Sequence, residues 1–370
     1  MKHKAFTLLE ILLVIAAIGI LVAIVIVAIN PQRQLAQVRN SERVSDSNTI
    51  QKGITQYLID EGTFPASINT LADGQIVEIC APTVDEATCI SDGLTDISAI
   101  TPRYLAQIPT DPNASGNSSG YALQKTNDTI TIFSLNTELN LIPPSAPKPT
   151  ISTEGLVGRW QFEEGSGTTA ADSGPIGNNG SFTGGNVTWS TNVPPIFEGV
   201  KNHSLRLEGD GGRVQVPHHP SLAISNNITL SFWVSMDNAE SSYEPILART
   251  NGSTSWPYDF WFSDRRFTYY IEQSSNGGGS VYQSGIPAPL QSNQWHYVTV
   301  VRDGNIVRHY LDGEFIDQVP MLGAANTVDR PLWIGTEGDG YGLSGNLHDV
   351  RIYNRPLTAL EVKTLSLGFE

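Results

Sequence analysis

One carboxylate near the start of the chain stands where a charge needs a partner. Glu10 lies at the edge of an apolar segment, and residues 11–29 contain no charged or strongly polar side chain. A carboxylate or an amine buried alone in apolar surroundings costs several kcal/mol, and the two become tolerable only as a pair. We therefore expect Glu10 to have a cationic partner.

The two cysteines of the chain, Cys80 and Cys89, lie close together in the sequence. Charged residues make up only 16% of the chain, and Gly, Ser, Thr and Asn are abundant, which is typical of secreted β-rich proteins. Outside the cell such a pair favours a small-loop disulfide, and the alternative is two unrelated buried thiols. The net charge of −15 opposes binding to nucleic acid or to an anionic membrane surface.

The apolar segment is long enough to cross a membrane, because as a helix it measures about 28 Å. A mostly basic head, Lys2, His3 and Lys4, precedes it. A cleaved signal peptide has a shorter apolar core and a small-x-small cleavage site, and this segment has neither. A plain membrane-anchor helix explains the length and the basic head but leaves Glu10 without a role.

The motif Ala5-Phe6-Thr7-Leu8-Leu9-Glu10 resembles the N-terminus of type IV prepilins and pseudopilins. The resemblance implies that a prepilin peptidase removes the leader, residues 1–5, by cutting between Ala5 and Phe6, and that the new amine of Phe6 is methylated. Residues 6–30 would then form a transmembrane helix that later enters a filament core. Glu10 would pair with the N-terminal amine of a neighbouring subunit. Ala5 stands where the family usually has glycine.

Residues 31–142 are expected to continue this helix and to add a small α+β pilin-like head. From residue 32 to 60, apolar residues recur at helical spacing, and Arg39 to Thr49 is expected to be a solvated middle portion. The apolar stripe consists of Leu35, Val38, Ile50, Ile54, Tyr57 and Leu58. Gly62 and Pro65 should end the helix. A strand at 76–80 and a hairpin of 121–124 with 129–135 complete the head.

Residues 143–154 are predicted to be a linker. Prolines stand at positions 143, 144, 147 and 149, and such a composition favours an extended segment that holds two domains apart.

From residue 155 to 370 the pattern changes to many short alternating strands separated by turn residues, which predicts a large antiparallel β-sandwich. The expected strands include 156–162, 228–234, 267–271, 295–302, 306–311, 332–334 and 347–353, followed by a helix at 358–365. Turn signals Asp303-Gly304-Asn305 and Asp312-Gly313 separate β segments.

The order of landmarks in this half resembles the laminin G-like, concanavalin A-like jelly roll. The matching pieces are 158–167, 172–174, 178–180, 205–209, 229–234, 295–298 with 310–313, and 345–357. The expected fold class is therefore multidomain, with a long N-terminal helix, a small α+β head and an all-β jelly roll.

Jelly rolls of this kind include glycoside hydrolases, but we expect no enzymatic activity. A retaining hydrolase needs two carboxyl groups about 5 Å apart, usually from a Glu-x-Asp-x-x-Glu strand, which this chain lacks. Asp312 and Glu314 lie across a turn glycine, and His218-His219 has no matching Cys or acidic cluster for zinc.

Two kinds of ligand are expected. The laminin G-like resemblance implies a structural calcium near the rim, with Asp172 and Asp349 as candidate ligands. The alternative is that Asp172 caps a turn and Asp349 forms a surface ion pair. For carbohydrate, Trp256, Tyr258 and Tyr341 lie in Gly/Ser-rich loops and are candidates for stacking on a sugar. The tryptophans expected in the core are Trp160, Trp233 and Trp295.

These features together predict a type IV pilin-like subunit, minor or at the tip, that displays the laminin G-like domain for adhesion or for recognition of carbohydrate or another surface ligand. Its partners would be other pilin subunits, the prepilin peptidase and the assembly machinery, without nucleic acid. Before assembly it would cross the cytoplasmic membrane once with its C-terminal domains outside, and afterwards it would lie on the cell surface. The alternatives are a non-polymerising membrane-anchored lectin-like protein and a type II secretion pseudopilin.

Overall fold

The fold is that of a computed structural model, and it describes residues 15, 31–127, 129–136, 149–197, 200–240, 243–250, 257–263, 266–272, 281–287, 290–327, 329–338 and 340–368. Ala5, Phe6 and Glu10, with the cleavage, methylation and pairing predicted for them, lie outside these residues. So does nearly all of the predicted transmembrane helix, 6–30. Within the described ranges, no helix combines the length and the apolar character that membrane crossing requires.

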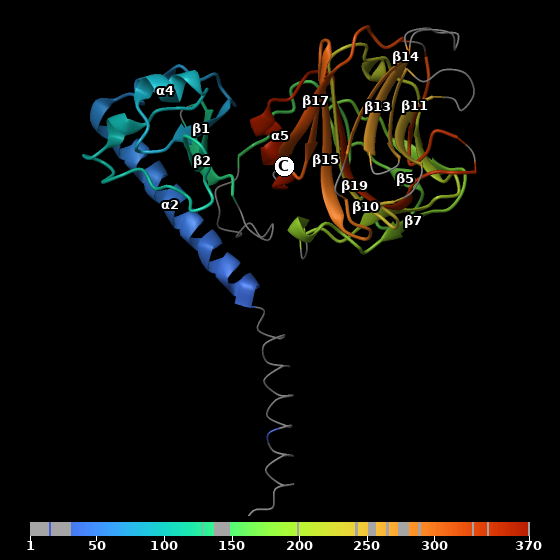
Figure 1. The fold of residues 1–370 in the computed structure, drawn as a ribbon, viewed down its shortest axis with the longest axis horizontal. Helices are drawn as coiled ribbons and strands as arrows, with labels where there is room; N and C mark the ends of the chain where they lie inside the picture. Colours follow the sequence, from blue (N-terminus) through green and yellow to red (C-terminus); the bar gives the residue numbers. More distant parts are fainter. Residues whose placement is uncertain are drawn as a thin grey trace, which may run out of the picture.

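A single long helix, α2 (Pro31–Glu61), leads into the head (Figure 1), which confirms the helix predicted over 32–60. The apolar stripe is buried only in its second half: Ile50 and Ile54 are inaccessible, whereas Leu35 and Val38 are 56% and 64% exposed. The first two residues of the stripe, Leu35 and Val38, therefore lie outside the contact between helix and head.

The expectation of a solvated middle portion of α2 is also wrong. Asn40, Arg43 and Ser47 are buried there. The guanidinium of Arg43 pairs with the carboxylate of Asp111 from the head, with Nη2 to Oδ1 at 3.2 Å, and its Nη1 donates to Asn40 Oδ1 at 2.8 Å. This buried ion pair attaches the polar face of the helix to the head, an arrangement that hydrophobic periodicity does not detect.

The head is a small α+β unit built on α2. Its antiparallel sheet has the order β1-β2-β3, and its apolar core lies between this sheet and the helix. The elements are α3 (Ala66–Asn69), β1 (Ile76–Cys80), α4 (Glu86–Ser91), the 3-10 helix Ser98–Ile100, β2 (Ser118–Thr126) and β3 (Thr129–Ser134). The predicted hairpin is confirmed, with Tyr121 opposite Ser134 and Thr126 opposite Thr129. Cys80 at the end of β1 forms a disulfide with Cys89 in α4, with the Cα atoms 5.9 Å apart.

The second half of the chain is a sandwich of two eight-stranded antiparallel sheets (Figure 1). The first sheet has the order β17-β16-β15-β10-β19-β8-β7, with β4 also paired to β19, and the second has the order β14-β13-β12-β11-β18-β9-β6-β5. The strands are β4 (Leu156–Trp160), β5 (Thr169–Ala170), β6 (Gly180–Thr183), β7 (Val187–Ser190), β8 (Ser204–Glu208), β9 (Arg213–Val216), β10 (Ile228–Met236), β11 (Glu244–Arg249), β12 (Tyr258–Ser263), β13 (Arg266–Glu272), β14 (Val281–Pro287), β15 (Trp295–Asp303), β16 (Ile306–Leu311), β17 (Glu314–Pro320), β18 (Leu332–Ile334) and β19 (Ser344–Tyr353). The main apolar core lies between the two sheets.

The predicted strands are confirmed with shifts of a few residues at their ends. The first predicted strand ends early, at Trp160, because Phe162 has a positive φ of 64° that extended backbone does not allow. Helix α5 (Ala359–Ser366) begins at a capping box in which Thr358 and Glu361 satisfy each other's backbone N–H groups. Trp160 and Trp233 are buried as expected, but Trp295 is only half-buried and donates its Nε1–H to Asn192 Oδ1.

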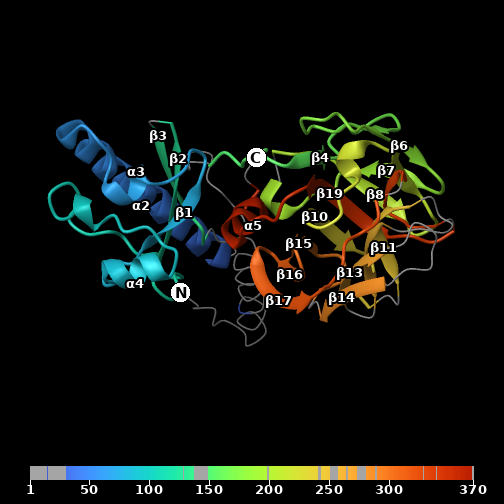
Figure 2. The same cartoon turned by 90° about the horizontal axis from the view of Figure 1, so that it is seen from above.

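The head and the sandwich are not held apart, which corrects the expectation for the linker. Figure 2 shows α5 between the sheet of the head and the strands of the sandwich. A second apolar cluster joins the two units; it contains Ala122, Phe133 and Leu135 of the head and Trp233, Tyr297, Tyr310, Val362 and Leu365 of the sandwich. Gln124 of β2 binds both backbone groups of Thr150, at 2.6 and 2.8 Å. The face of the head sheet that α2 leaves uncovered is apolar, and the sandwich buries it.

Candidate functional site

The outer face of the second sheet carries aromatic and acidic side chains side by side. In β12, Tyr258, Phe260 and Phe262 belong to the core, so the residues between them, Asp259 and Trp261, point to the opposite face. In β13 the same alternation sends Tyr270 outward, and Asp259 and Tyr270 are directly paired across the two strands. Two strands thus place a carboxyl group, an indole and a phenol on one surface.

A tightly wound loop between β18 and β19 adds Glu337 and Tyr341 to this surface. Thr336 lies at its centre: the Thr336 hydroxyl donates to carbonyl oxygens of the loop and accepts the N–H of Gly338 at 3.0 Å. The N–H of Gly335 donates to the carbonyl of Ile246 in β11 at 2.8 Å. At Gly335 a φ of 106° and the nearby Leu207 leave no room for a side chain. These contacts fix the loop on the sheet beside Asp259.

The side chains surround a small depression, which we call the aromatic–acidic pocket. It has a volume of about 190 Å³ and is lined by Tyr243, Asp259, Trp261, Tyr270 and Glu337. The ring centroids of Tyr243 and Trp261 are 5.9 Å apart, and those of Trp261 and Tyr270 are 5.6 Å apart. Tyr341 extends the row, 6.1 Å from Tyr243, and is 45% exposed. Four rings therefore form an open wall around two carboxyl groups.

The two carboxyl groups of the pocket interact with each other. Asp259 is 1% exposed, and Glu337 lines the same pocket beside it. Burial, and then the neighbouring Glu337, raises the pKa of Asp259 well above its ordinary value of 3.8. A pair of this kind keeps one proton under conditions in which isolated carboxyl groups have lost theirs. Burial and the two nearby carboxyl groups likewise raise the pKa of Tyr243, so its hydroxyl stays neutral.

One oxygen of the pair lacks a hydrogen bond. Oδ1 of Asp259 is buried, and no donor among the described residues contacts it. A buried acceptor left in this state costs about 1–3 kcal/mol, which a donor from a ligand would offset. The pocket therefore combines ring faces for stacking with a buried acceptor that a ligand donor can satisfy.

The spacing of the carboxyl groups fits binding better than hydrolysis. Retaining glycosidases hold their two carboxyl groups about 5 Å apart and inverting ones about 6.5–9.5 Å apart, with the substrate or a water between them. Asp259 and Glu337 instead line the same small pocket and interact directly with each other. Within the described part of the chain, no three His, Cys, Asp or Glu side chains gather as metal ligands.

The structure places the three predicted sugar-stacking residues differently. Tyr341 lies beside the aromatic–acidic pocket, and its stacking on a sugar stays a prediction. Tyr258 is a core residue, fully buried, and its hydroxyl donates to the carbonyl of Leu222 at 3.1 Å, so it cannot stack on a sugar. Trp256 lies outside the described residues. The missed residues carried a signal, since the alternation in Tyr258-Asp259-Phe260-Trp261-Phe262 separates two faces once the segment is taken as a strand rather than a loop.

The two predicted calcium ligands are engaged by protein donors. Asp349 is buried and pairs with the guanidinium groups of Arg159 and Arg351, at 2.7 and 2.6 Å. Both oxygens of Asp172 accept backbone N–H groups, from Arg159, Gly174 and Asn178. These contacts favour the turn-capping and ion-pair alternatives, although the Asp349 pair is buried rather than on the surface. Calcium binding stays a prediction, which calorimetric titration of the full chain with Ca²⁺ tests; no heat and no rise in Tm would refute it.

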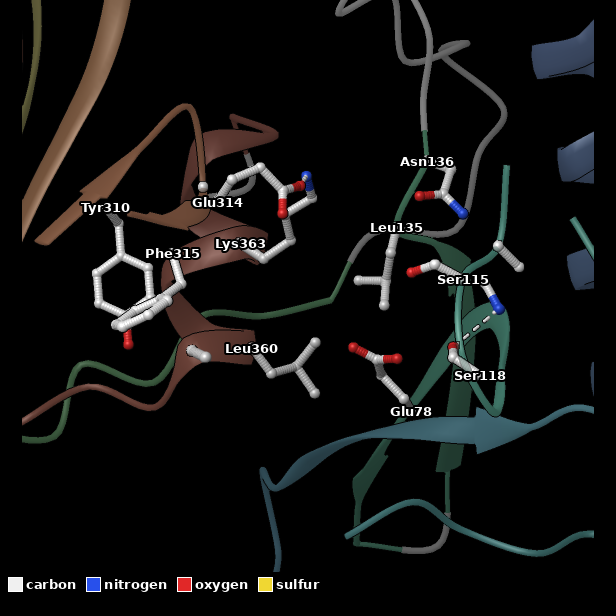
Figure 3. A pocket seen from close by; sticks show the side chains of 14 residues that line it. Glu78, Ser115, Ser118, Leu135, Asn136, Tyr310, Glu314, Phe315, Leu360 and Lys363 are labelled. Carbon is white, nitrogen blue, oxygen red and sulfur yellow. Dashed lines mark hydrogen bonds and ion pairs between the residues drawn. The ribbon is translucent and has the colours of Figure 1, made fainter. Parts of the chain in front are cut away.

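A second pocket, of about 250 Å³, lies in the contact between the head and the sandwich (Figure 3). Glu78, Ser115, Ser118 and Asn136 of the head face Tyr310, Glu314, Phe315, Leu360 and Lys363 of the sandwich. Its cation is already paired, because Nζ of Lys363 donates to Glu314 Oε1. The pocket is a polar edge of the interface above the apolar cluster, and we rank it below the aromatic–acidic pocket as a binding site.

One family model matches part of the second half of the chain. Residues 208–363 match the family model described as the concanavalin A-like lectin/glucanases superfamily, so this stretch is a laminin G-like jelly-roll domain. The match includes every residue of the aromatic–acidic pocket.

Solved structures with a similar fold include the binding domain of botulinum neurotoxin serotype D, with 14% identity, a TM-score of 0.44 and coverage of 58% of this chain and 52% of that one. Another is domain 4 of AbnA, a GH43 extracellular arabinanase from Geobacillus stearothermophilus, in complex with arabinotriose, with 15% identity, a TM-score of 0.42 and coverage of 57% and 98%. The chain spans about half the length of the neurotoxin binding domain. Similarity at this level carries no information on ligand or activity.

Proposed function

We propose that the jelly roll binds carbohydrate, without hydrolysing it, at the aromatic–acidic pocket. The observation that carries the proposal is the row of partly exposed rings beside the unpaired Oδ1 of Asp259. Sugars offer apolar ring faces that stack on aromatic side chains, and hydroxyl groups that donate to carboxyl oxygens. The pocket supplies both kinds of contact within a few ångströms.

The proposal is tested by screening the purified full-length chain on a glycan array and measuring the Kd of the best glycan by calorimetry. Trp261→Ala and Tyr270→Ala should each weaken binding at least about tenfold, that is by about 1.4 kcal/mol. The matched control is Trp295→Ala, because Trp295 is also a half-buried aromatic residue but lies in the first sheet. Binding that survives both pocket substitutions would refute the site.

We further propose that the chain is a type IV pilin-like subunit that displays this domain. The motif Ala5-Phe6 with Glu10 supports processing and assembly, and the exposed Leu35 and Val38 on α2 support packing against other subunits. Exposed apolar residues in a row on one helix are a common feature of interaction surfaces. The small head on α2 would be a pilin-like head, and the jelly roll would lie on the cell surface after assembly.

Mass spectrometry of the mature N-terminus tests the second proposal. Cleavage before Phe6 with one added methyl group supports it, whereas an intact Met1 or a cut further into the apolar segment contradicts it. If the chain is cut and methylated but forms no filament, the remaining hypothesis is a type II secretion pseudopilin. If it is uncut, the remaining hypothesis is a membrane-anchored lectin-like protein.

A further inference from the structure

We infer, building on the proposed sugar site, that the aromatic–acidic pocket selects a ligand carrying a protonated amine, so that its sugar is an amino sugar rather than a neutral or an acidic one.

The first argument is the charge of the pocket. The described residues that line it include two carboxyl groups, three aromatic rings and no basic side chain. Among the described residues, the groups that face the pair from neighbouring elements are also uncharged. Ala248 of β11 lies opposite Asp259 on one side, Tyr270 of β13 lies opposite it on the other, and Tyr341 lies beside Glu337. A carboxylate or sulfate on the ligand would meet only like charge here.

The second argument is the arrangement of the rings. A cation held within about 6 Å of the face of a tryptophan or tyrosine ring is attracted by the electrons of that ring. Tyr243, Trp261 and Tyr270 have successive centroid distances of 5.9 and 5.6 Å, and Tyr341 continues the row at 6.1 Å. Aromatic rings that flank carboxyl groups in this manner form a cage suited to an ammonium group.

The third argument is hydrogen-bond stoichiometry. An ammonium group has three donors and no acceptor, so it can donate to the unpaired Oδ1 of Asp259 and to Glu337 at the same time. It takes the place of the proton that the pair holds, and that proton passes to solvent. A neutral hydroxyl group can satisfy Oδ1 with one donor, but it does not replace the proton of the pair and offers no positive charge to the rings.

The size of the pocket agrees with this assignment. Its volume of about 190 Å³ is below the range of about 300–1,000 Å³ of pockets that enclose a drug-sized ligand. The pocket therefore holds one substituent or one sugar unit, and the rest of a longer glycan lies outside it.

The test compares two ligands that differ only at the amine: an oligomer of glucosamine and the N-acetylated oligomer of the same length, each titrated into the full-length chain. We expect the free amine to bind at least about tenfold more tightly at a pH where it is protonated. Binding should release protons, which calorimetry detects as a heat that changes with the ionisation enthalpy of the buffer. Affinity should fall as acid reprotonates the pair.

Substitutions separate this inference from the proposed function. Glu337→Gln keeps the shape of the side chain and removes one carboxylate, so the ratio of the affinities for the amine and the acetylated oligomer should fall to about one. Equal binding of both oligomers, weakened by Trp261→Ala, would overturn the inference and leave the sugar site standing. Tighter binding of a sialylated glycan would also overturn the inference alone. Binding of no glycan at all would overturn both.

Discussion

The carboxyl groups of Asp259 and Glu337 meet in one small pocket on the outer face of the second sheet, although one comes from a strand and the other from a loop. Two acids in contact are unfavourable unless they share a proton, and here one of them is also buried. The neighbouring acids at this pocket therefore lower the stability of the fold. Groups in binding sites frequently have this property.

This cost predicts a pH-dependent stabilisation by Asp259→Asn. A folded-state pKa above the unfolded value stabilises the fold at low pH, and this contribution is lost as the pH rises through the folded value. The amide stays neutral at every pH. The free energies of unfolding of the two proteins should therefore be most alike at acidic pH, where both side chains are neutral. Above the ordinary pKa of 3.8 the variant should gain about 1.4 kcal/mol relative to the natural chain for each pH unit, up to the folded-state pKa. Asp317→Asn, in an exposed part of β17, is the control and should show no such trend. A Tm difference that does not change with pH would contradict the shared proton.

A substitution in the loop should disturb the pocket indirectly. A Cβ atom at Gly338 would lie 2.7 Å from the hydroxyl oxygen of Tyr341, closer than such contacts allow. We expect Gly338→Ala to displace the Tyr341 ring and to weaken glycan binding about as much as Tyr341→Ala does, a few-fold, with little change in Tm. The two substitutions act on the same contact, so the double variant should bind no more weakly than Tyr341→Ala alone. Additive losses in the calorimetric Kd would show that Gly338 acts by another route.

The ion pairs of Asp349 predict a large stability effect. Burial by itself raises the pKa of Asp349, but Arg351 and Arg159 outweigh it and lower the pKa far below its usual range. Asp349→Ala leaves two guanidinium groups without this partner. It should lower the free energy of unfolding, measured with urea, by about 3–5 kcal/mol. Because the carboxylate is stabilised by these partners, its contribution persists down to strongly acidic pH. A loss below about 1 kcal/mol would mean that the arginines find other acceptors.

The apolar cluster between the head and the sandwich predicts that both units unfold together. Phe133 is 2% exposed in this cluster. Phe133→Ala should lower the free energy of unfolding by about 3 kcal/mol or more. It should also split the single calorimetric unfolding transition into two. Phe315→Ala removes a half-exposed ring from β17 and should change stability by less than about 0.5 kcal/mol. Two transitions already present in the natural chain would refute the coupling.

Sequence patterns predicted the elements much better than the contacts between them. The strands from Ile228 onward and the helix after Thr358 follow from alternation and capping, because these are local properties of the chain. The burial of Arg43 against Asp111 and the packing of the head on α5 depend on surfaces that meet only in three dimensions. The proline-rich composition gave no information on whether the units on its two sides would touch.

In the candidate site, too, residues in strands could be predicted from the sequence and the residue in a loop could not. Asp259, Trp261 and Tyr270 could have been placed on one face from their alternation with core residues in two neighbouring strands. Glu337 could not, because it lies in a loop whose course is set by Thr336 and by contacts with Ile246. Tyr258 was assigned to a loop because the residues before it are rich in glycine and serine, and this reversed its orientation.

The contact between head and sandwich also determines how the molecule carries a mechanical load. When a glycan holds the pocket and the N-terminal helix is pulled, tension passes from the second sheet through the sandwich core to the apolar cluster around Phe133, and from there to α2. The interface between head and sandwich therefore lies on the path of any force that acts between α2 and the second sheet.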